Sequence, residues 1–182
     1  MQPAGYRVNF PDGFSGQRGL FYDYILASSG LFVRSESPLL RATIRIAEAE
    51  VRGLAPLEEK VDLVHGKIPA WMGRLALNTL ASARDREMYL AITFQNGYHL
   101  RFPTQERHTA SVRFDRVPNT VVDIHSHGLM GAFFSETDNI DEQGMSLYVV
   151  VGKLDEELPE ALLRVGVYGY FKELVWEDVF EL

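Results

Sequence analysis

The first third of the chain contains two short aromatic or apolar runs and one segment in which apolar and polar positions alternate. Residues 19–24 and 31–34 are aromatic or apolar runs, separated by the turn-forming triplet Ser28-Ser29-Gly30. Residues 40–46 alternate regularly, as a strand with one buried face does. The pattern predicts a β-rich N-terminal segment.

The period changes to that of a helix from residue 69. Pro69 suits the first helical position, and apolar side chains recur at helical spacing towards residue 84. These side chains are Trp71, Met72, Leu75, Leu80 and Ala83. The stripe predicts one helix that faces the core.

Strand patterns dominate the rest of the chain. Residues 88–94 and 98–102 flank Asn96-Gly97, which is a strong hairpin signal. Further strands are expected at 110–114, 120–124, 146–151, 163–170 and 174–180, with a short helix at 135–144. We therefore predict an α+β fold, a mixed β-sheet packed with helices. Its divisions are a β-rich N-terminal extension or small module over residues 1–66 and a main domain over 67–182.

Composition narrows the possible chemistry. The chain has no cysteine, so a metal site must use His, Asp, Glu, backbone or water. The net charge of −7 argues against a nucleic-acid partner. No apolar run is long enough to cross a membrane and no secretory signal is visible, so a cytoplasmic protein is expected.

Two histidines and a carboxylate form the most informative pattern. His125 and His127 end an apolar strand, and side chains two apart on a strand leave the same face. Ser135 is a good N-cap, and Asp138 three residues later falls in the first helical turn. Two neutral imidazoles, one carboxylate and one water make the open tetrahedral set of a catalytic zinc site.

The order H-x-H, seven residues, S-x-x-D resembles the signature of the JAMM/MPN metalloprotease family. His125, His127, Ser135 and Asp138 match it without a gap. The resemblance is specific over residues 123–138 and extends over the domain from about residue 69. It implies the mixed sheet of that family and one Zn²⁺ per chain, held by the two histidines and Asp138.

The same resemblance implies a catalytic glutamate upstream that polarises water. Glu87 occupies the corresponding place after the first helix, and Glu59 and Glu106 are weaker alternatives. Ser135 is a candidate donor to the reaction's oxyanion, or serves as a cap alone.

Two further carboxylates are candidates for supporting the metal ligands. Asp123 is placed to orient a ligand imidazole. Glu142 is a candidate for similar work, with a solvated helix face as the alternative.

Residues 132–135, 141–142 and 148–152 resemble bacterial members of the family, including those of the PRTRC plasmid-associated gene system. Such members accompany ubiquitin-like proteins and their activating and conjugating enzymes. The resemblance implies a zinc-dependent peptidase or isopeptidase that cleaves after the C-terminus of a ubiquitin-like protein or peptide substrate. The alternative is a catalytically weak or inactive MPN-type protein-binding module in a bacterial conjugation-like system. Residues 1–66 are a hypothetical recognition region.

Other readings of the histidine pair fit less well. An amidohydrolase barrel begins with a similar D-x-H-x-H but needs about 250 residues, and residues 128–182 are too few for the remainder. The zincin pattern H-E-x-x-H is absent from the sequence.

Non-haem iron remains chemically possible as the metal. A bacterial branch of the fold linked to DNA repair usually has proline where this chain has Gly128. His65, His99 and His108 lack ligand spacing and are interpreted as structural or exposed.

Overall fold

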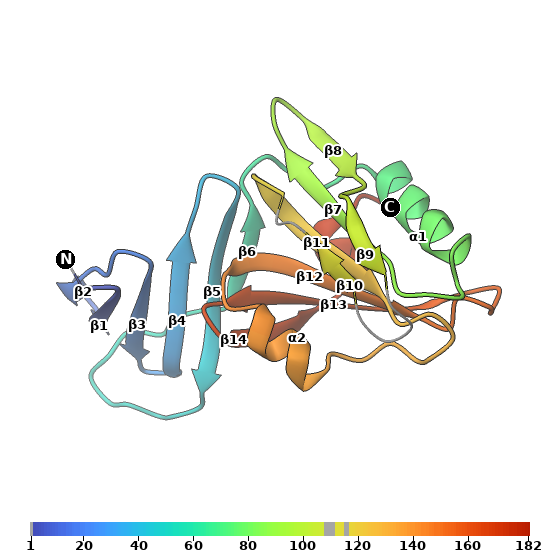
Figure 1. Ribbon diagram of the computed structural model, residues 1–182. Helices are drawn as coiled ribbons and strands as arrows, with labels where there is room; N and C mark the ends of the chain where they lie inside the picture. Colours follow the sequence, from blue (N-terminus) through green and yellow to red (C-terminus); the bar gives the residue numbers. More distant parts are fainter. Residues whose placement is uncertain (1, 108–111, 115–116) are drawn as a thin grey trace.

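The computed structural model describes residues 2–107, 112–114 and 117–182. It contains two six-stranded sheets that lie side by side, with the N-terminal sheet on the left in Figure 1 and the second sheet on the right. A separate two-stranded hairpin lies in front of the second sheet. The chain therefore completes one sheet before it begins the other.

The N-terminal sheet has the strand order β2-β1-β3-β4-β5-β6. The strands are β1 (Ala4–Phe10), β2 (Gly13–Gln17), β3 (Tyr22–Ala27), β4 (Gly30–Glu36), β5 (Leu40–Ala47) and β6 (Lys60–Leu63). β1 and β3 are parallel, and the other neighbours are antiparallel. The predicted strands correspond to β3, β4 and β5. β2 escaped prediction because all of its residues are exposed, so no buried face imposes an alternation.

The second sheet has the order β14-β13-β12-β11-β7-β8. Its strands are β7 (Tyr89–Phe94), β8 (Tyr98–Arg101), β11 (Thr120–Ser126), β12 (Met145–Gly152), β13 (Glu160–Val167) and β14 (Tyr170–Leu174). Only β11 and β12 run parallel among these pairs. β9 (Gln105–Arg107) and β10 (Val112–Phe114) form the hairpin. The prediction of a strand over 110–114 falls partly outside the described residues.

The first helix packs through a different stripe from the one predicted. α1 (Ala70–Ala81) begins after Pro69 and buries Met72, Gly73, Ala76 and Leu80. Trp71 and Leu75 are 55% and 44% exposed, so the prediction that they face the core is wrong. A Cβ at Gly73 would lie 2.8 Å from the Trp176 ring. Small side chains therefore mark the buried face, because they admit the aromatic rings near the C-terminus.

The predicted strand over residues 174–180 is also wrong. β14 ends at Leu174, and the short helix α3 (Trp176–Val179) follows. Phe180 then bridges to Ile68, which precedes α1, and the backbone N–H of Ile68 donates to the carbonyl of Val179 at 2.9 Å. The apolar character of this segment reflects burial against α1, and burial alone does not separate a strand from a short helix.

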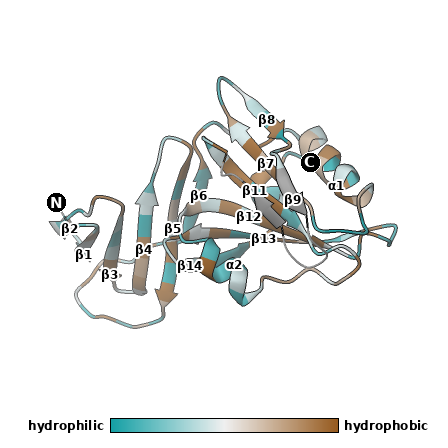
Figure 2. Cartoon of the chain, viewed as in Figure 1, coloured by the Kyte–Doolittle hydropathy of each residue, from teal (hydrophilic) through white to brown (hydrophobic). Residues whose placement is uncertain are grey.

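One hydrophobic core joins the two sheets. The inner face of the second sheet contributes Leu90, Ile124, Val149 and Val165, together with further buried residues of the same strands. Val33, Leu40 and Ile44 of the N-terminal sheet belong to the same cluster. Apolar colouring runs through the central strands of both sheets in Figure 2. The division between residues 66 and 67 stays a prediction.

The helices are few and the mixed sheets make up most of the regular structure. The predicted mixed sheet is confirmed, in a chain richer in sheet than the predicted α+β arrangement suggested. Among the described residues, no helix is both long enough and apolar enough to span a membrane.

Candidate metal centre

β11 presents both histidines on the face opposite the core. Val122 and Ile124 point inward and are fully or almost fully buried, so His125 leaves the outer face. His127 follows the strand with the same parity, and the two imidazole centroids are 5.1 Å apart. The alternation of a half-buried strand therefore places the two rings together.

Ser126, between the histidines, performs a task that sequence reasoning missed. Its hydroxyl oxygen accepts a hydrogen bond from the backbone N–H of Met88 at 3.1 Å, and its own N–H donates to the Met88 carbonyl at 3.0 Å. Both contacts lie inside the protein, where Ser126 is fully buried. They fix the residue after Glu87 to the strand end that carries the histidines. The signal was a small polar residue at an inward-facing position.

Asp138 is oriented by the cap of α2 (Glu136–Asp141). Its Oδ2 accepts from the backbone N–H of Ser135 at 2.6 Å and from the Ser135 hydroxyl at 2.7 Å. The Ser135 hydroxyl oxygen in turn accepts from the Asp138 N–H at 3.2 Å, which completes a capping box. With Oδ2 engaged, Oδ1 lies 3.4 Å from His125 Nε2. The cap thus leaves one carboxylate oxygen free to face the imidazoles.

These residues form a compact set of metal-ligand atoms. One ligand atom each from His125, His127 and Asp138 lies within 4.8 Å of the others. Among the described residues this is the one group of three or more potential ligands so arranged. The structure therefore brings together the three predicted metal ligands.

The chemistry of this set fits a cation. His125 Nε2 and His127 Nδ1 are buried and make no hydrogen bond to the described part of the chain. Burial lowers the pKa of His125 to about 4, although the Asp138 charge works in the other direction. Burial also lowers the pKa of His127. Neutral imidazole lone pairs beside a carboxylate oxygen would repel one another, and a shared divalent cation removes that repulsion.

Glu87 is close enough to the centre for its carboxyl group to interact with the charge of Asp138. Burial, and next the negative charge of Asp138, raise the pKa of its half-buried carboxyl group. β7 begins at Tyr89, so Glu87 stands in the loop before the strand, two positions earlier than its first residue. Its assignment as the catalytic base stays a prediction.

The two alternative glutamates have different settings. Glu59 accepts a hydrogen bond from Lys172 at 2.6 Å and another from the Arg45 N–H at 2.8 Å, away from the histidines. The backbone of Glu106 belongs to β9, and its side chain lies outside what the structure describes. Glu59 is thus a structural ion-pair partner.

The two carboxylates predicted to support the metal ligands have partners of their own. Asp123 accepts a hydrogen bond from the Tyr89 hydroxyl, and its predicted role beside an imidazole stays a prediction. Glu142 is only 7% exposed and accepts from Arg164 at 2.9 Å and 2.5 Å, so the alternative of a solvated helix face is wrong. Burial raises the pKa of Glu142 to about 7, although Arg164 works in the other direction.

The loop between His127 and Ser135 is held close to the sheet. Gly128 has φ of +60°, which proline cannot adopt, and a Cβ there would lie 3.0 Å from the Arg84 carbonyl oxygen. A Cβ at Gly152 would lie 2.3 Å from the Ala132 backbone nitrogen. The loop exposes the apolar side chains of Leu129, Met130 and Phe133 beside the centre.

Among the described residues, the remaining histidines, His65 and His99, give no second centre. His65 stacks on Phe94 with ring centroids 3.7 Å apart, and His99 Nε2 lies 3.1 Å from the Gln95 carbonyl oxygen. Both are exposed, as predicted. His108 lies outside the described residues.

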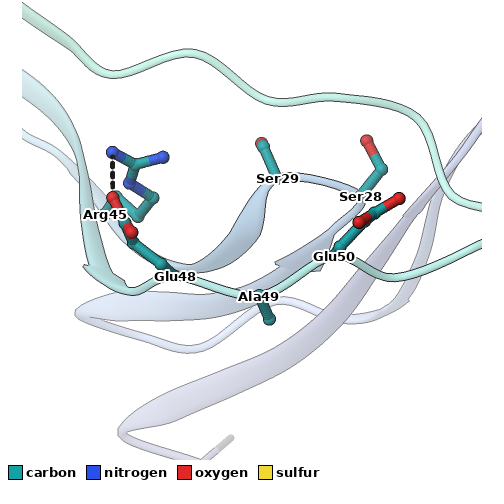
Figure 3. Close-up of a pocket in the computed structure, with 6 residues that line it drawn as sticks. All are labelled: Ser28, Ser29, Arg45, Glu48, Ala49 and Glu50. Carbon is teal, nitrogen blue, oxygen red and sulfur yellow. Dashed lines mark ion pairs between the residues drawn. The ribbon is translucent and has the colours of Figure 1, made fainter.

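A shallow depression of about 460 Å³ belongs to the N-terminal region rather than to the histidine centre. It is lined by Ser28, Ser29, Arg45, Glu48, Ala49 and Glu50. Figure 3 shows its one ion pair among the side chains drawn, between Arg45 and Glu48 at 3.0 Å. This depression offers serines and charged groups but no set of ligands like that on β11 and α2.

Comparison with known protein families identifies a match over most of the chain. Residues 37–164 match the family model described as prokaryotic homologs of the JAB domain. The matched segment covers well over half of the chain and includes every residue of the centre described above. No curated protein matches the chain.

Proposed function

The chain belongs to the family of prokaryotic JAB-domain homologs, and from that premise we propose that it is a zinc-dependent peptidase or isopeptidase. It cleaves the bond after the C-terminus of a ubiquitin-like modifier. The site that does so is carried by a sheet of the JAMM/MPN type. The observation that carries this proposal is the closeness of His125, His127 and Asp138, whose ligand atoms lie within 4.8 Å of one another.

The donor set favours zinc. Two imidazole nitrogens and one carboxylate oxygen are three protein ligands, which leaves a fourth tetrahedral position open, as in catalytic sites. When bound, Zn²⁺ lowers the pKa of a water molecule to about 7 and polarises a carbonyl oxygen. The protein's part is to hold the three donors in place, which β11 and the α2 cap do.

Glu87 acts as the general base. It accepts a proton from the attacking water and then delivers that proton to the departing amine. Its raised pKa supports both tasks, because a base is most effective when its pKa lies near the working pH. Ser126 supports this role indirectly, since its hydrogen bonds with Met88 fix the segment that carries Glu87.

Ser135 donates to the oxyanion that develops as the amide carbonyl is attacked. In the structure its hydroxyl proton is directed to Asp138 Oδ2, at 2.7 Å. The hydroxyl must therefore turn towards the substrate while the Ser135 backbone N–H continues to hold Asp138. A donor of this kind contributes about 10²–10³ in kcat.

The substrate is a ubiquitin-like protein whose extended tail reaches the centre. β8 is an edge strand of the second sheet and pairs with β7 on its other side. The extended tail of the substrate adds to the open edge of β8 as a further strand. The exposed apolar loop with Leu129, Met130 and Phe133 supplies contacts to the tail beside the bond that is cut. Activating and conjugating enzymes of the same modifier system are further proposed partners.

The test combines bound zinc with cleavage of modifier–reporter fusions. We expect one zinc per chain and cleavage by the native protein. Glu87→Gln should keep its zinc but lose about 10²–10⁴ in kcat, the usual contribution of a positioned base. Glu136→Gln is the matched control, because Glu136 is an exposed carboxylate at the start of α2.

The outcomes separate the alternatives. A native chain that takes up no divalent ion would overturn the proposal. Zinc uptake without cleavage of any fusion would identify a protein-binding module instead of an enzyme. Full activity of Glu87→Gln would leave the metal centre standing and remove Glu87 as the base.

A further inference from the structure

α2 carries Asp138 but has few means of its own to hold a position. It spans only Glu136–Asp141, and none of its residues is buried. Isolated helices of this length are unstable, and a helix without a buried face gains little from packing. Yet Asp138 must remain within reach of His125, which belongs to a strand of the sheet. Another part of the chain must therefore fix α2 to the sheet.

Arg164 supplies that attachment from β13. Its Nε and Nη2 donate to Glu142 Oε2 at 2.9 Å and 2.5 Å, and its Nη1 donates to Asn139 Oδ1 at 2.7 Å. The Arg164 residue is 5% exposed, and its two bonds to Glu142 are buried, whereas the bond to Asn139 is partly buried. A planar guanidinium with several donors in a fixed fork defines orientation as well as distance.

Two aromatic rings complete the setting of the guanidinium. The Cζ atom of Arg164 lies 3.7 Å from the centroid of the Phe134 ring and 3.8 Å from that of Phe171. Phe171 belongs to β14 of the sheet, whereas Phe134 directly precedes the cap residue Ser135. Arg164 therefore contacts the chain before the cap, within α2 and at its C-cap, which is Glu142.

We infer that Arg164 is a positioning residue for the metal centre, which sets the distance of Asp138 from the two histidines. This inference rests on the proposed metal binding and extends it to a residue that is not itself a ligand. The contacts of Arg164 surround the ligand in sequence: Phe134 lies four positions before Asp138, Asn139 one after and Glu142 four after. Because Arg164 holds the chain on both sides of Asp138, it fixes the position of the Asp138 carboxylate.

Arg164→Lys tests the inference most sharply. Lysine keeps the positive charge but loses the planar fork and its stacking between the rings. Zn²⁺ affinity is measured by competition with a chromogenic chelator, at a temperature well below the unfolding midpoint of each metal-free variant. We expect affinity to fall by about 10–100-fold, as for other residues that orient metal ligands. In the proposed reaction kcat should fall while KM changes little.

Arg34→Lys is the matched control. Arg34 is likewise an arginine on a strand, half-buried, with Phe14 under its guanidinium at 5.0 Å and Thr43 accepting from Nε at 2.9 Å. It belongs to the N-terminal sheet, so its replacement should lower the unfolding midpoint without changing zinc affinity. Equal losses of affinity in both variants would mean a general loss of structure and would overturn the inference.

A milder variant keeps the test decisive if Arg164→Lys does not fold. Asn139→Ala removes one acceptor of Arg164 at an exposed position. A several-fold loss of zinc affinity supports the inference, and unchanged affinity overturns it. If the native chain binds no zinc, the proposed function fails as well. If the native and Arg164→Lys proteins bind zinc equally, the inference alone fails.

Discussion

Each six-stranded sheet has a partly or fully buried aspartate beside it, and the groups that surround these two aspartates differ. Asp23 in the N-terminal sheet accepts from the Gly19 N–H at 2.7 Å on Oδ1, and its Oδ2 pairs with Arg7 at 3.5 Å and Arg18 at 3.7 Å. Asp138 beside the second sheet has donors on Oδ2 only. Its Oδ1 faces an imidazole nitrogen that has no hydrogen-bond partner in the described chain.

The difference separates a structural carboxylate from a candidate ligand. Asp23 meets cations and donors that the chain itself supplies, so its charge is already compensated. Asp138 faces imidazole nitrogens that have no hydrogen-bond partner in the described chain, and a bound cation would compensate that arrangement. A buried atom without a partner is not enough by itself, since Arg7 Nε in the N-terminal sheet is one too. What marks the centre is that two such atoms, His125 Nε2 and His127 Nδ1, lie close to one carboxylate.

The same substitution at both aspartates tests this difference most directly. Asp138→Asn should lower zinc affinity by about 100-fold or more and reduce cleavage to background, because a charged ligand is lost. Asp23→Asn should leave zinc affinity unchanged and lower the free energy of unfolding by about 1–3 kcal/mol, because the partly buried Arg7 loses its charged partner. Chelator competition and urea unfolding measure the two effects. Zinc loss in Asp23→Asn would show that the two regions are not independent.

Two serines with similar hydrogen bonds, one in each region, allow a second test with a smaller expected effect. Ser135→Ala removes a cap hydroxyl and should cost about 0.5–2 kcal/mol of stability, and in addition lower kcat by about 10²–10³ if the hydroxyl also stabilises the oxyanion. Ser37→Ala is the control in the N-terminal region, where the Ser37 hydroxyl oxygen accepts from the Leu40 N–H at 3.0 Å. It should lower stability alone. Equal kcat in Ser135→Ala and the native protein would restrict Ser135 to the cap.

The smallest effect concerns the ion pair that joins the two sheets. Burial alone would raise the pKa of Glu59, but hydrogen bonds from Lys172 and the Arg45 backbone lower it below the ordinary value of 4.5. A carboxyl group with a lowered pKa in the folded state stabilises the protein above the pKa of the unfolded chain, and this stabilisation is lost as pH falls through the folded value.

Glu59→Gln should therefore lower the free energy of unfolding at pH 7 by about 1 kcal/mol or less, because the pair is partly exposed. The difference between the variant and the native protein should vanish in acid, below the lowered pKa. Urea unfolding at several pH values measures it. A difference that persists unchanged in acid would contradict the assignment of the effect to charge.

Much of the second sheet followed from local pattern. The strand-like run over 88–94 and the Asn96-Gly97 turn placed β7 and β8, and the apolar run before His125 placed β11. Prediction failed where burial came from distant chain segments. Trp71 and Leu75 match a helical stripe but are exposed, because α1 approaches Trp176 and Phe180 through Gly73 instead. Residues 174–180 are apolar because they pack on α1, and that packing does not specify a strand.

Sequence alone determined the composition of the centre. A two-residue spacing on a strand and a three-residue spacing across a cap are local geometry, so His125, His127 and Asp138 could be grouped before any fold was known. Tertiary structure alone decided how they are held. Ser126 fixes Met88, and Arg164 reaches Glu142 from a strand twenty-two positions away in the chain. The physical reason is that such contacts depend on register and packing between elements, which no single stretch of sequence contains.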